Sequence, residues 1–258
     1  MRDKKTYVIL ILMLVVFLLV MFLMFGIDEL KRSRNQTTLI VDNTTWVYKN
    51  KRWRYVSNSD NFESLNWKAY QIFDGGKSIG NYYLWHDDKW YVFDKNKNAV
   101  QLENELFAYN SDYNIDIKSI TKENIIDRTY VDKVLSDNDL DINSKFTSSY
   151  KTSSDIDNDG IKEDFYVLTN AFPLDFTPKD TFSIVFMVKD NEIYNLYTNV
   201  KGYTAYDGCS PDIKAILDLD EDDTSEVVLS CYRYDNLGRI DMLYRFNEKE
   251  FKILISNQ

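Results

Sequence analysis

The stretch Asp155-Ile156-Asp157-Asn158-Asp159-Gly160-Ile161-Lys162-Glu163, followed at once by the apolar run Phe165 to Leu168, is the most informative part of this sequence. In an irregular turn, carboxylates at positions 1, 3 and 5 point into one concavity, and a glycine at position 6 lets the chain reverse with a positive φ. A carbonyl at position 7 and an acid at position 9 complete the set of oxygen ligands around a cation. These roles fall in order to Asp155, Asp157, Asp159, the Ile161 carbonyl and Glu163.

This ligand set predicts Ca²⁺ as the cofactor. Unit charges about 4 Å apart repel by roughly 1 kcal/mol in water, so acids crowded into a short loop favour a cation among them. Ca²⁺ takes about six to eight oxygens in flexible geometry, whereas Mg²⁺ requires a stricter octahedron. The loop is not an EF-hand, because that loop ends in a bidentate Glu where this chain has Tyr166.

A second copy of the pattern begins at Asp218 and leads into the apolar run Val227 to Leu229. Position 6 is Asp223, which tolerates a positive φ better than most residues but at some cost, so we expect this site to be weaker or empty. The alternative for both loops is a pair of solvated acidic turns. The ligand positions of the second loop hold Asp218, Asp220, Asp222, the Thr224 carbonyl and Glu226.

The pattern Asp-x-Asp-x-Asp-Gly-x-x-Glu before a hydrophobic strand resembles the FG-GAP and VCBS repeats of integrin-type β-propellers and many bacterial surface proteins. The resemblance covers about residues 150 to 170 and 213 to 234, and it implies Ca²⁺ in the loops. A closed propeller needs several blades, whereas this chain has room for about two recognisable ones. We therefore expect an incomplete propeller-like or sandwich architecture.

Residues 7 to 27 are almost wholly apolar, and no charge occurs in them before Asp28. A helix of about 20 such residues crosses the hydrocarbon core of a membrane. Met24 to Ile27 lack the small residues of a signal-peptide cleavage site, which favours a cytoplasmic tail and an uncleaved transmembrane signal anchor over residues 1 to 27. The chain is thus expected to contact the membrane through residues 7 to 27.

Charge barely decides the orientation of this span, because basic residues flank it on both sides. A short tail before a long span behaves like a signal sequence, and Ca²⁺ and disulfides both belong outside the cell. We therefore expect a single-pass protein of the cell membrane with its C-terminal domain extracellular. A cytoplasmic C-terminal domain is the alternative. The flanking basic residues are Arg2, Lys4 and Lys5 against Lys31, Arg32 and Arg34.

The rest of the chain predicts a mainly β (α+β) ectodomain with one soluble helix. The net charge of -10 argues against nucleic acid or an anionic lipid surface as a partner. Residues 28 to 45 are polar without hydrophobic periodicity and are interpreted as a stalk. Aromatic runs between hairpin turns predict a small antiparallel β domain over residues 46 to 118. Residues 119 to 258 then form the FG-GAP-like β-rich domain with both acidic loops.

The predicted soluble helix covers Thr121 to Leu135. Thr121 can cap its N-terminus, and apolar residues follow at helical spacing. This apolar stripe consists of Ile126, Tyr130, Val131, Val134 and Leu135.

Cys209 and Cys231 flank the second acidic loop and are the only cysteines. Outside the membrane we expect them to form a disulfide. Two buried free thiols are the alternative.

No catalytic motif accompanies these features. His86 is the only histidine, and no nucleophile motif or phosphate-binding glycine loop is present, so we expect no enzyme activity. The segment Asp88 to Asp94 resembles one unit of aromatic choline- and glucan-binding repeats, although aromatic packing on one face of a hairpin is the favoured interpretation. The first hypothesis is a non-catalytic surface protein that binds a cell-wall glycan or a surface protein. The alternative is a cell-wall or glycan-processing enzyme with an unrecognised acid pair.

Overall fold

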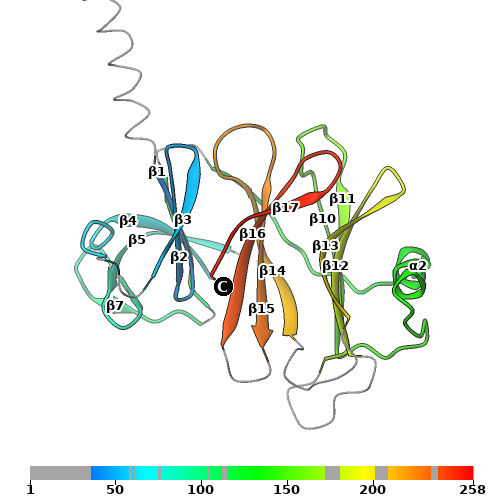
Figure 1. The fold of residues 1–258 in the computed structure, drawn as a ribbon. Helices are drawn as coiled ribbons and strands as arrows, with labels where there is room; N and C mark the ends of the chain where they lie inside the picture. The colour runs from blue at the N-terminus through cyan, green and yellow to red at the C-terminus, as the bar shows by residue number, and fades with distance from the viewer. Residues whose placement is uncertain are drawn as a thin grey trace, which may run out of the picture.

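A computed structural model describes residues 36–57, 60, 62–74, 77–103, 105–111, 115–171, 181–200, 209–233 and 238–257. This part of the chain is mainly β, with three open antiparallel sheets and one helix, α2 (Thr129–Asp137). Figure 1 shows the sheets side by side, with α2 against the outer face of the last sheet. The predicted β-rich class is therefore confirmed.

The first sheet, here called the N-terminal sheet, has the order β3-β2-β1-β8-β4-β5-β6-β7. The predicted hairpins are confirmed, because β2 pairs with β3, β4 with β5, and β5 with β6. The strands are β1 (Gln36–Val41), β2 (Thr44–Lys49), β3 (Arg52–Val56), β4 (Ala69–Asp74), β5 (Lys77–His86), β6 (Trp90–Phe93), β7 (Ala99–Val100) and β8 (Phe107–Ser111).

The other two sheets are built on the same plan of four consecutive antiparallel strands. The outer sheet has the order β10-β11-β12-β13, and the middle sheet has the order β17-β16-β15-β14-β9. Their strands are β9 (Asp116–Lys118), β10 (Ser148–Ser154), β11 (Glu163–Thr169), β12 (Phe182–Lys189), β13 (Glu192–Val200), β14 (Cys209–Asp218), β15 (Glu226–Arg233), β16 (Arg239–Phe246) and β17 (Phe251–Ser256).

The middle sheet is buried on both faces, as the continuous apolar runs of its strands predict. On β15, Val227 and Leu229 belong to the core shared with the outer sheet. Val228, between them, belongs to the core shared with the N-terminal sheet. This alternation follows from the two-residue period of a strand. On the far face of the outer sheet, Val131, Val134 and Leu135 of α2 cover β11 and β12.

The cysteine prediction is confirmed, because Cys209 and Cys231 form a disulfide. The bridge joins the paired strands β14 and β15, where Cys231 lies opposite Pro211. Both cysteines are buried in the core between the middle and outer sheets.

The predicted stalk is wrong for residues 36 to 45. These residues form β1 and the start of β2, and Leu39 and Ile40 are completely buried. The β-branched and apolar run from Thr37 to Val41 pairs with β8, which supplies the partners that an isolated stalk lacks. Residues 28 to 35 lie outside the described residues.

The predicted domain boundary after residue 118 also differs from the structure. Strand β9 pairs with β14 and therefore belongs to the middle sheet. The N-terminal and middle sheets share one core, which includes Trp46, Phe73, Leu217 and Leu243. The predicted small domain over residues 46 to 118 is therefore not a separate unit in the described part of the chain.

The predicted helix begins eight residues too early. Glu123 forms a β-bridge with Lys151, with N–H to carbonyl distances of 2.8 and 2.9 Å. Its backbone groups therefore pair with β10 and do not form helical hydrogen bonds. The Asp127 carboxylate accepts the N–H and the hydroxyl of Thr129, the first helical residue, at 2.9 and 2.7 Å. Ile126, placed on the apolar stripe by the prediction, is 93% exposed.

The predicted membrane span over residues 7 to 27 lies outside the described residues. Within them, the structure contains no helix that combines the length and the apolar character needed to cross a membrane.

We predict that replacing both cysteines by alanine lowers the free energy of unfolding by about 3 kcal/mol, because the bridge closes a loop across 22 residues. Denaturant unfolding of the full-length chain in detergent, followed by tryptophan fluorescence, measures the change. Wild-type protein treated with reductant should show a similar loss, which separates the cross-link from sulfur packing. Equal stability of all three samples would contradict the prediction.

Candidate metal centre

The two acidic loops occupy the same place in two successive units of four strands. The first joins β10 to β11, and the second joins β14 to β15. In both loops, positions 4 and 6 have positive φ. The values are 57° at Asn158 and 86° at Gly160 in the first loop, and 58° at Glu221 and 66° at Asp223 in the second. The loops therefore share one backbone path, which the local sequence pattern predicted.

The acid at position 1 closes the turn in each loop. The Asp155 carboxylate accepts the N–H groups of Asp159 and Gly160 at 3.1 and 3.0 Å. Asp218 accepts the equivalent two N–H groups of the second loop at 3.3 and 3.1 Å. These hydrogen bonds hold the loop in shape through the same carboxylate that the sequence assigns as the first ligand.

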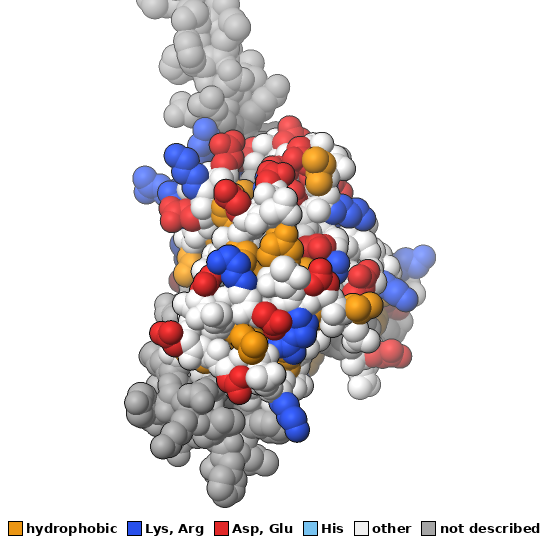
Figure 2. Space-filling view, turned by 90° about the vertical axis from the view of Figure 1, so that its right-hand side faces the viewer, with side chains coloured by type: hydrophobic (Ala, Val, Ile, Leu, Met, Phe, Trp, Pro, Cys, Tyr) orange, Lys and Arg blue, Asp and Glu red, His pale blue; other side chains and the backbone are white. Residues whose placement is uncertain are grey.

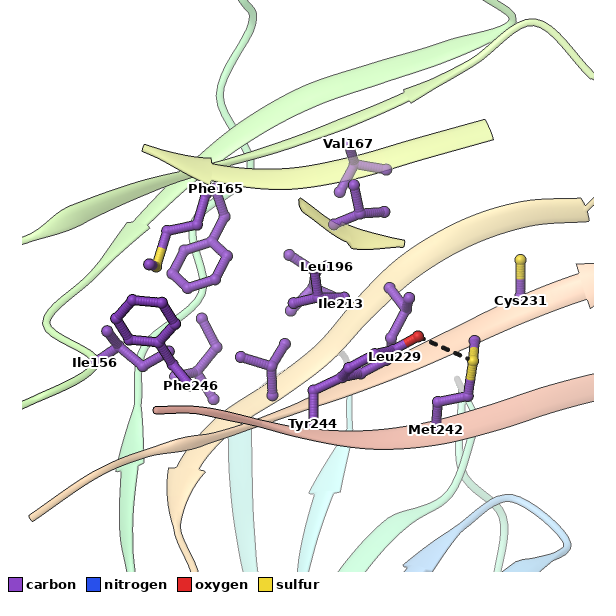
Figure 3. Close-up of a cluster of buried hydrophobic side chains, with 14 of the residues drawn as sticks. Ile156, Phe165, Val167, Leu196, Ile213, Leu229, Cys231, Met242, Tyr244 and Phe246 are labelled. Carbon is purple, nitrogen blue, oxygen red and sulfur yellow. Dashed lines mark hydrogen bonds between the residues drawn. The ribbon is translucent and has the colours of Figure 1, made fainter. Parts of the chain in front are cut away.

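The acid at position 9 fixes each loop to the hydrophobic core. Glu163 and Glu226 are buried, and each accepts the N–H of the residue at position 2, at 2.9 Å from Ile156 and 3.0 Å from Leu219. Both position 2 side chains are completely buried. Figure 3 shows Ile156 beside Phe246 in the core between the outer and middle sheets. Loop geometry and sheet packing are thus linked.

Each loop brings three carboxylates close enough to hold one metal ion. In the first loop, one oxygen each from Asp155, Asp157 and Glu163 lie within 4.8 Å of one another. In the second loop, the set consists of Asp218, Asp220 and Asp222, so the predicted ligands Asp159 and Glu226 are not members of these two sets. In the first loop, the Asp157 Oδ1 atom is buried and has no hydrogen-bond partner within the described residues. Carboxylate oxygens of this kind are ligands for hard cations.

The residues at position 7, whose carbonyl groups are predicted ligands, are held through their backbone N–H groups. The N–H groups of Ile161 and Thr224 donate to the position 5 carboxylates, at 2.7 and 3.1 Å. The ligand role of their carbonyl oxygens stays a prediction. The Ile161 residue is 64% exposed, so the tip of the first loop is open to solvent.

A lysine on the neighbouring strand lies against the acids of the first loop. The Lys189 Nζ atom, at the end of β12, is 2.9 Å from Asp157, 3.1 Å from Asp159 and 3.0 Å from Glu163. Burial opposes its charge, but the hydrogen bonds to these acids outweigh that effect and raise the pKa of Lys189. The first loop thus already contains one positive charge.

An arginine has the equivalent place in the second loop. The Arg245 guanidinium on β16 is 2.7 Å from Asp220 and 3.2 Å from Asp222, and its Nε atom is 2.6 Å from Glu226. Burial opposes its charge, but attraction to Glu226 and Asp220 outweighs that effect and raises the pKa of Arg245. Burial also raises the pKa of Glu226 to about 8, although Arg245 and the Leu219 N–H oppose the rise.

These two cations were missed by the sequence analysis. Lys189 lies 26 residues after Glu163, whereas Arg245 lies 19 residues after Glu226, so no fixed spacing connects them to the loops. The strand register does connect them. Asp164 pairs with Val188, which places Glu163 opposite Lys189, and Glu226 pairs directly with Arg245.

The two loops also contact each other. The Ser225 N–H donates to the Ile156 carbonyl at 2.7 Å, and the Asn158 amide lies 3.4 Å from the Asp223 carboxylate. Both loops lie at the upper end of the molecule in Figure 1. Figure 2 shows acidic side chains gathered at the same end of the face that it presents. The candidate metal centre is therefore a pair of adjacent acidic loops.

A separate cleft of about 840 Å³ lies between the N-terminal and middle sheets and contains further acids. Burial acts to raise the pKa of Glu105, but Tyr232 and Lys214 outweigh it and hold that pKa below its ordinary value. Burial acts in the same way on Asp212, and Lys214 and Lys122 again lower the pKa. Both carboxylates lie beside the Lys214 ammonium in this cleft, at 3.0 Å for Glu105 and 2.9 Å for Asp212.

Comparison of this chain with models of protein families, with curated proteins and with solved structures finds no match.

We predict opposite effects on stability for exchanges at position 6 of the two loops. Gly160→Ala should lower the free energy of unfolding by about 1 kcal/mol, because a side chain at φ 86° is strained although its Cβ meets no atom within 4 Å. Asp223→Gly should raise it by about 0.5 kcal/mol, since glycine adopts positive φ freely. Chemical denaturation of the chelator-treated chain measures both. The same sign for both exchanges would contradict the shared backbone path.

Proposed function

We propose that this chain is a membrane-anchored extracytoplasmic protein whose β-rich part is stabilised by Ca²⁺ in the first acidic loop, and that its role is non-catalytic binding at the cell envelope. The observation that carries this proposal is the convergence of Asp155, Asp157 and Glu163 within 4.8 Å, with the buried Asp157 Oδ1 atom unpartnered among the described residues. A buried oxygen without a partner is costly, and a cation would satisfy it.

The donor set favours Ca²⁺ over other ions. The three side chains that converge in the first loop all offer carboxylate oxygens, and hard cations prefer these ligands. The loop is irregular and exposed at its tip, which suits the variable coordination of Ca²⁺ better than the strict octahedron of Mg²⁺. Extracellular Ca²⁺ sites have dissociation constants of about 0.1 to 1 mM, so a modest site is filled outside the cell.

The architecture is consistent with the resemblance to FG-GAP and VCBS repeats. Two units of four antiparallel strands pack face to face, and each carries its acidic loop between its first two strands. Consecutive propeller blades pack in this manner. We propose that the outer and middle sheets are two such blades of an incomplete propeller-like stack, with the N-terminal sheet covering the free face of the second.

The membrane anchor in this proposal rests on the apolar run of residues 7 to 27. The described chain begins close to the second acidic loop, since the Thr37 hydroxyl lies 3.4 Å from the Leu219 carbonyl. Tyr48 of the same sheet donates to Asp220 at 3.2 Å. The described chain therefore begins on the side of the domain that carries the acidic loops.

A row of aromatic side chains supports a cell-wall glycan as the partner. Register places Tyr83 opposite Phe93 and Trp85 opposite Tyr91 on the face of β5 and β6 that is turned away from Leu84 and Val92. Trp67, itself 45% exposed, packs on Phe93 with ring centroids 5.1 Å apart. Exposed aromatic rings offer flat apolar surfaces on which the apolar faces of sugar rings can stack.

We predict that Ca²⁺ raises the thermal midpoint of the full-length chain in detergent and that EDTA removes the increase, because an ion that binds the folded state stabilises it. Asp157→Asn should weaken binding by about tenfold or more, since it removes one ligand charge. Isothermal titration calorimetry measures the affinity. Asp164→Asn is the matched control, because Asp164 bonds Ser153 and Lys151 outside the cluster. Wild-type protein that gives neither heat nor a shifted midpoint with millimolar Ca²⁺ would refute the calcium proposal.

A second prediction concerns the glycan. Trp85→Ala with Tyr91→Ala should reduce co-sedimentation of the full-length chain with insoluble peptidoglycan by about tenfold, which corresponds to about 1.4 kcal/mol of binding free energy, since both flat apolar surfaces are removed. Trp53→Ala, on strand β3, is the aromatic control and should sediment like the wild type. Equal sedimentation of the double variant and the wild type would refute a cell-wall glycan as the partner.

A further inference from the structure

The two acidic loops differ in what already neutralises them. In both loops the carboxylates at positions 3, 5 and 9 contact a single basic side chain from the next strand, Lys189 in the first loop and Arg245 in the second. Two of these three acids also belong to the carboxylate set that could hold a metal ion, namely Asp157 and Glu163 in the first loop and Asp220 and Asp222 in the second. The basic side chain and a metal ion therefore compete for the same carboxylates.

The remaining oxygens distinguish the loops. In the second loop, each oxygen of these three acids has a partner. Arg245 contacts one oxygen of each. The other oxygens accept the Tyr48 hydroxyl and the N–H groups of Thr224 and Leu219. In the first loop, the Asp157 Oδ1 atom lacks a partner among the described residues. The second loop is satisfied without a metal ion, and the first is not.

The two basic groups also differ in how they hold their partners. The guanidinium is a rigid fork, and its Nε, Nη1 and Nη2 atoms contact different acids at the same time. The Lys189 ammonium is a single point charge on a flexible stem and can withdraw toward solvent. Displacing Arg245 breaks more directed hydrogen bonds than displacing Lys189.

We propose that Arg245 is the resident cation of the second loop and excludes Ca²⁺ from it, so that the chain binds one calcium ion, in the first loop, in competition with Lys189. This inference rests on the proposed calcium function for the first loop only. It assigns Arg245 as the residue that determines which of the two loops binds metal. The sequence predicts a weak or empty second site because of Asp223 at position 6. This proposal attributes the empty site to Arg245 instead.

The test counts the calcium ions bound by chelator-treated full-length protein in detergent, by equilibrium dialysis with radioactive calcium. The expected stoichiometry is one for the wild type and two for Arg245→Met, because the freed acids of the second loop then require a cation. Lys189→Met should bind one ion about tenfold or more tightly than the wild type, since it removes the competitor. Arg239→Met is the matched control, because Arg239 lies on the same strand and pairs with Asp241 instead. It should bind one ion.

The outcomes separate this inference from the proposed function. A wild type that binds two ions, or an Arg245→Met variant that binds the same number as the wild type, overturns the assignment of Arg245. A wild type that binds none, with an Arg245→Met variant that binds one, refutes calcium in the first loop and supports Arg245. Should Arg245→Met fail to fold without Ca²⁺, folding restored by millimolar Ca²⁺ supports the proposal. Arg245→Lys, which keeps the charge, then provides the second variant, and its failure to gain a weak second site overturns the proposal.

Discussion

A carboxylate removed from water needs hydrogen-bond donors or a cation beside it, and this constraint shapes both acidic loops. Glu163 and Glu226 are buried at the base of their loops. In each glutamate, one carboxylate oxygen accepts a hydrogen bond from a backbone N–H group, and the other accepts one from a basic side chain on the next strand. The acids at positions 3 and 5 of each loop contact that same positive charge. The charge balance of the loop is therefore decided by the neighbouring strand as well as by the loop itself.

This balance is linked to the packing of all three sheets. The N–H groups that bind the two buried glutamates belong to Ile156 and Leu219. Ile156 lies in the core between the outer and middle sheets, whereas Leu219 lies in the core between the middle and N-terminal sheets. A change of charge in either loop thus acts on an interface between sheets. A cation that bound in such a loop would stabilise the arrangement of the sheets and not the loop alone.

Much of this arrangement could be predicted from local sequence. The acids at positions 1, 3, 5 and 9 and the apolar strands after them are local patterns, and the structure brings three of the four acids together in each loop. Lys189 and Arg245 could not be predicted, because the hairpins that bring them to Glu163 and Glu226 differ in length. The same limit explains the errors elsewhere. Residues 37 to 41 pair with β8, far along the chain, and Glu123 is held by β10, so long-range pairing overrides the local pattern in both places.

Anomalous diffraction from crystals of the full-length chain grown in millimolar calcium is the decisive measurement of the calcium assignment. One anomalous peak is expected, in the first loop, with Asp155, Asp157 and Glu163 as ligands, Lys189 displaced from them, and Arg245 still bound to Glu226. Crystals with no peak in the first loop and Lys189 still bonded to its three acids would contradict it.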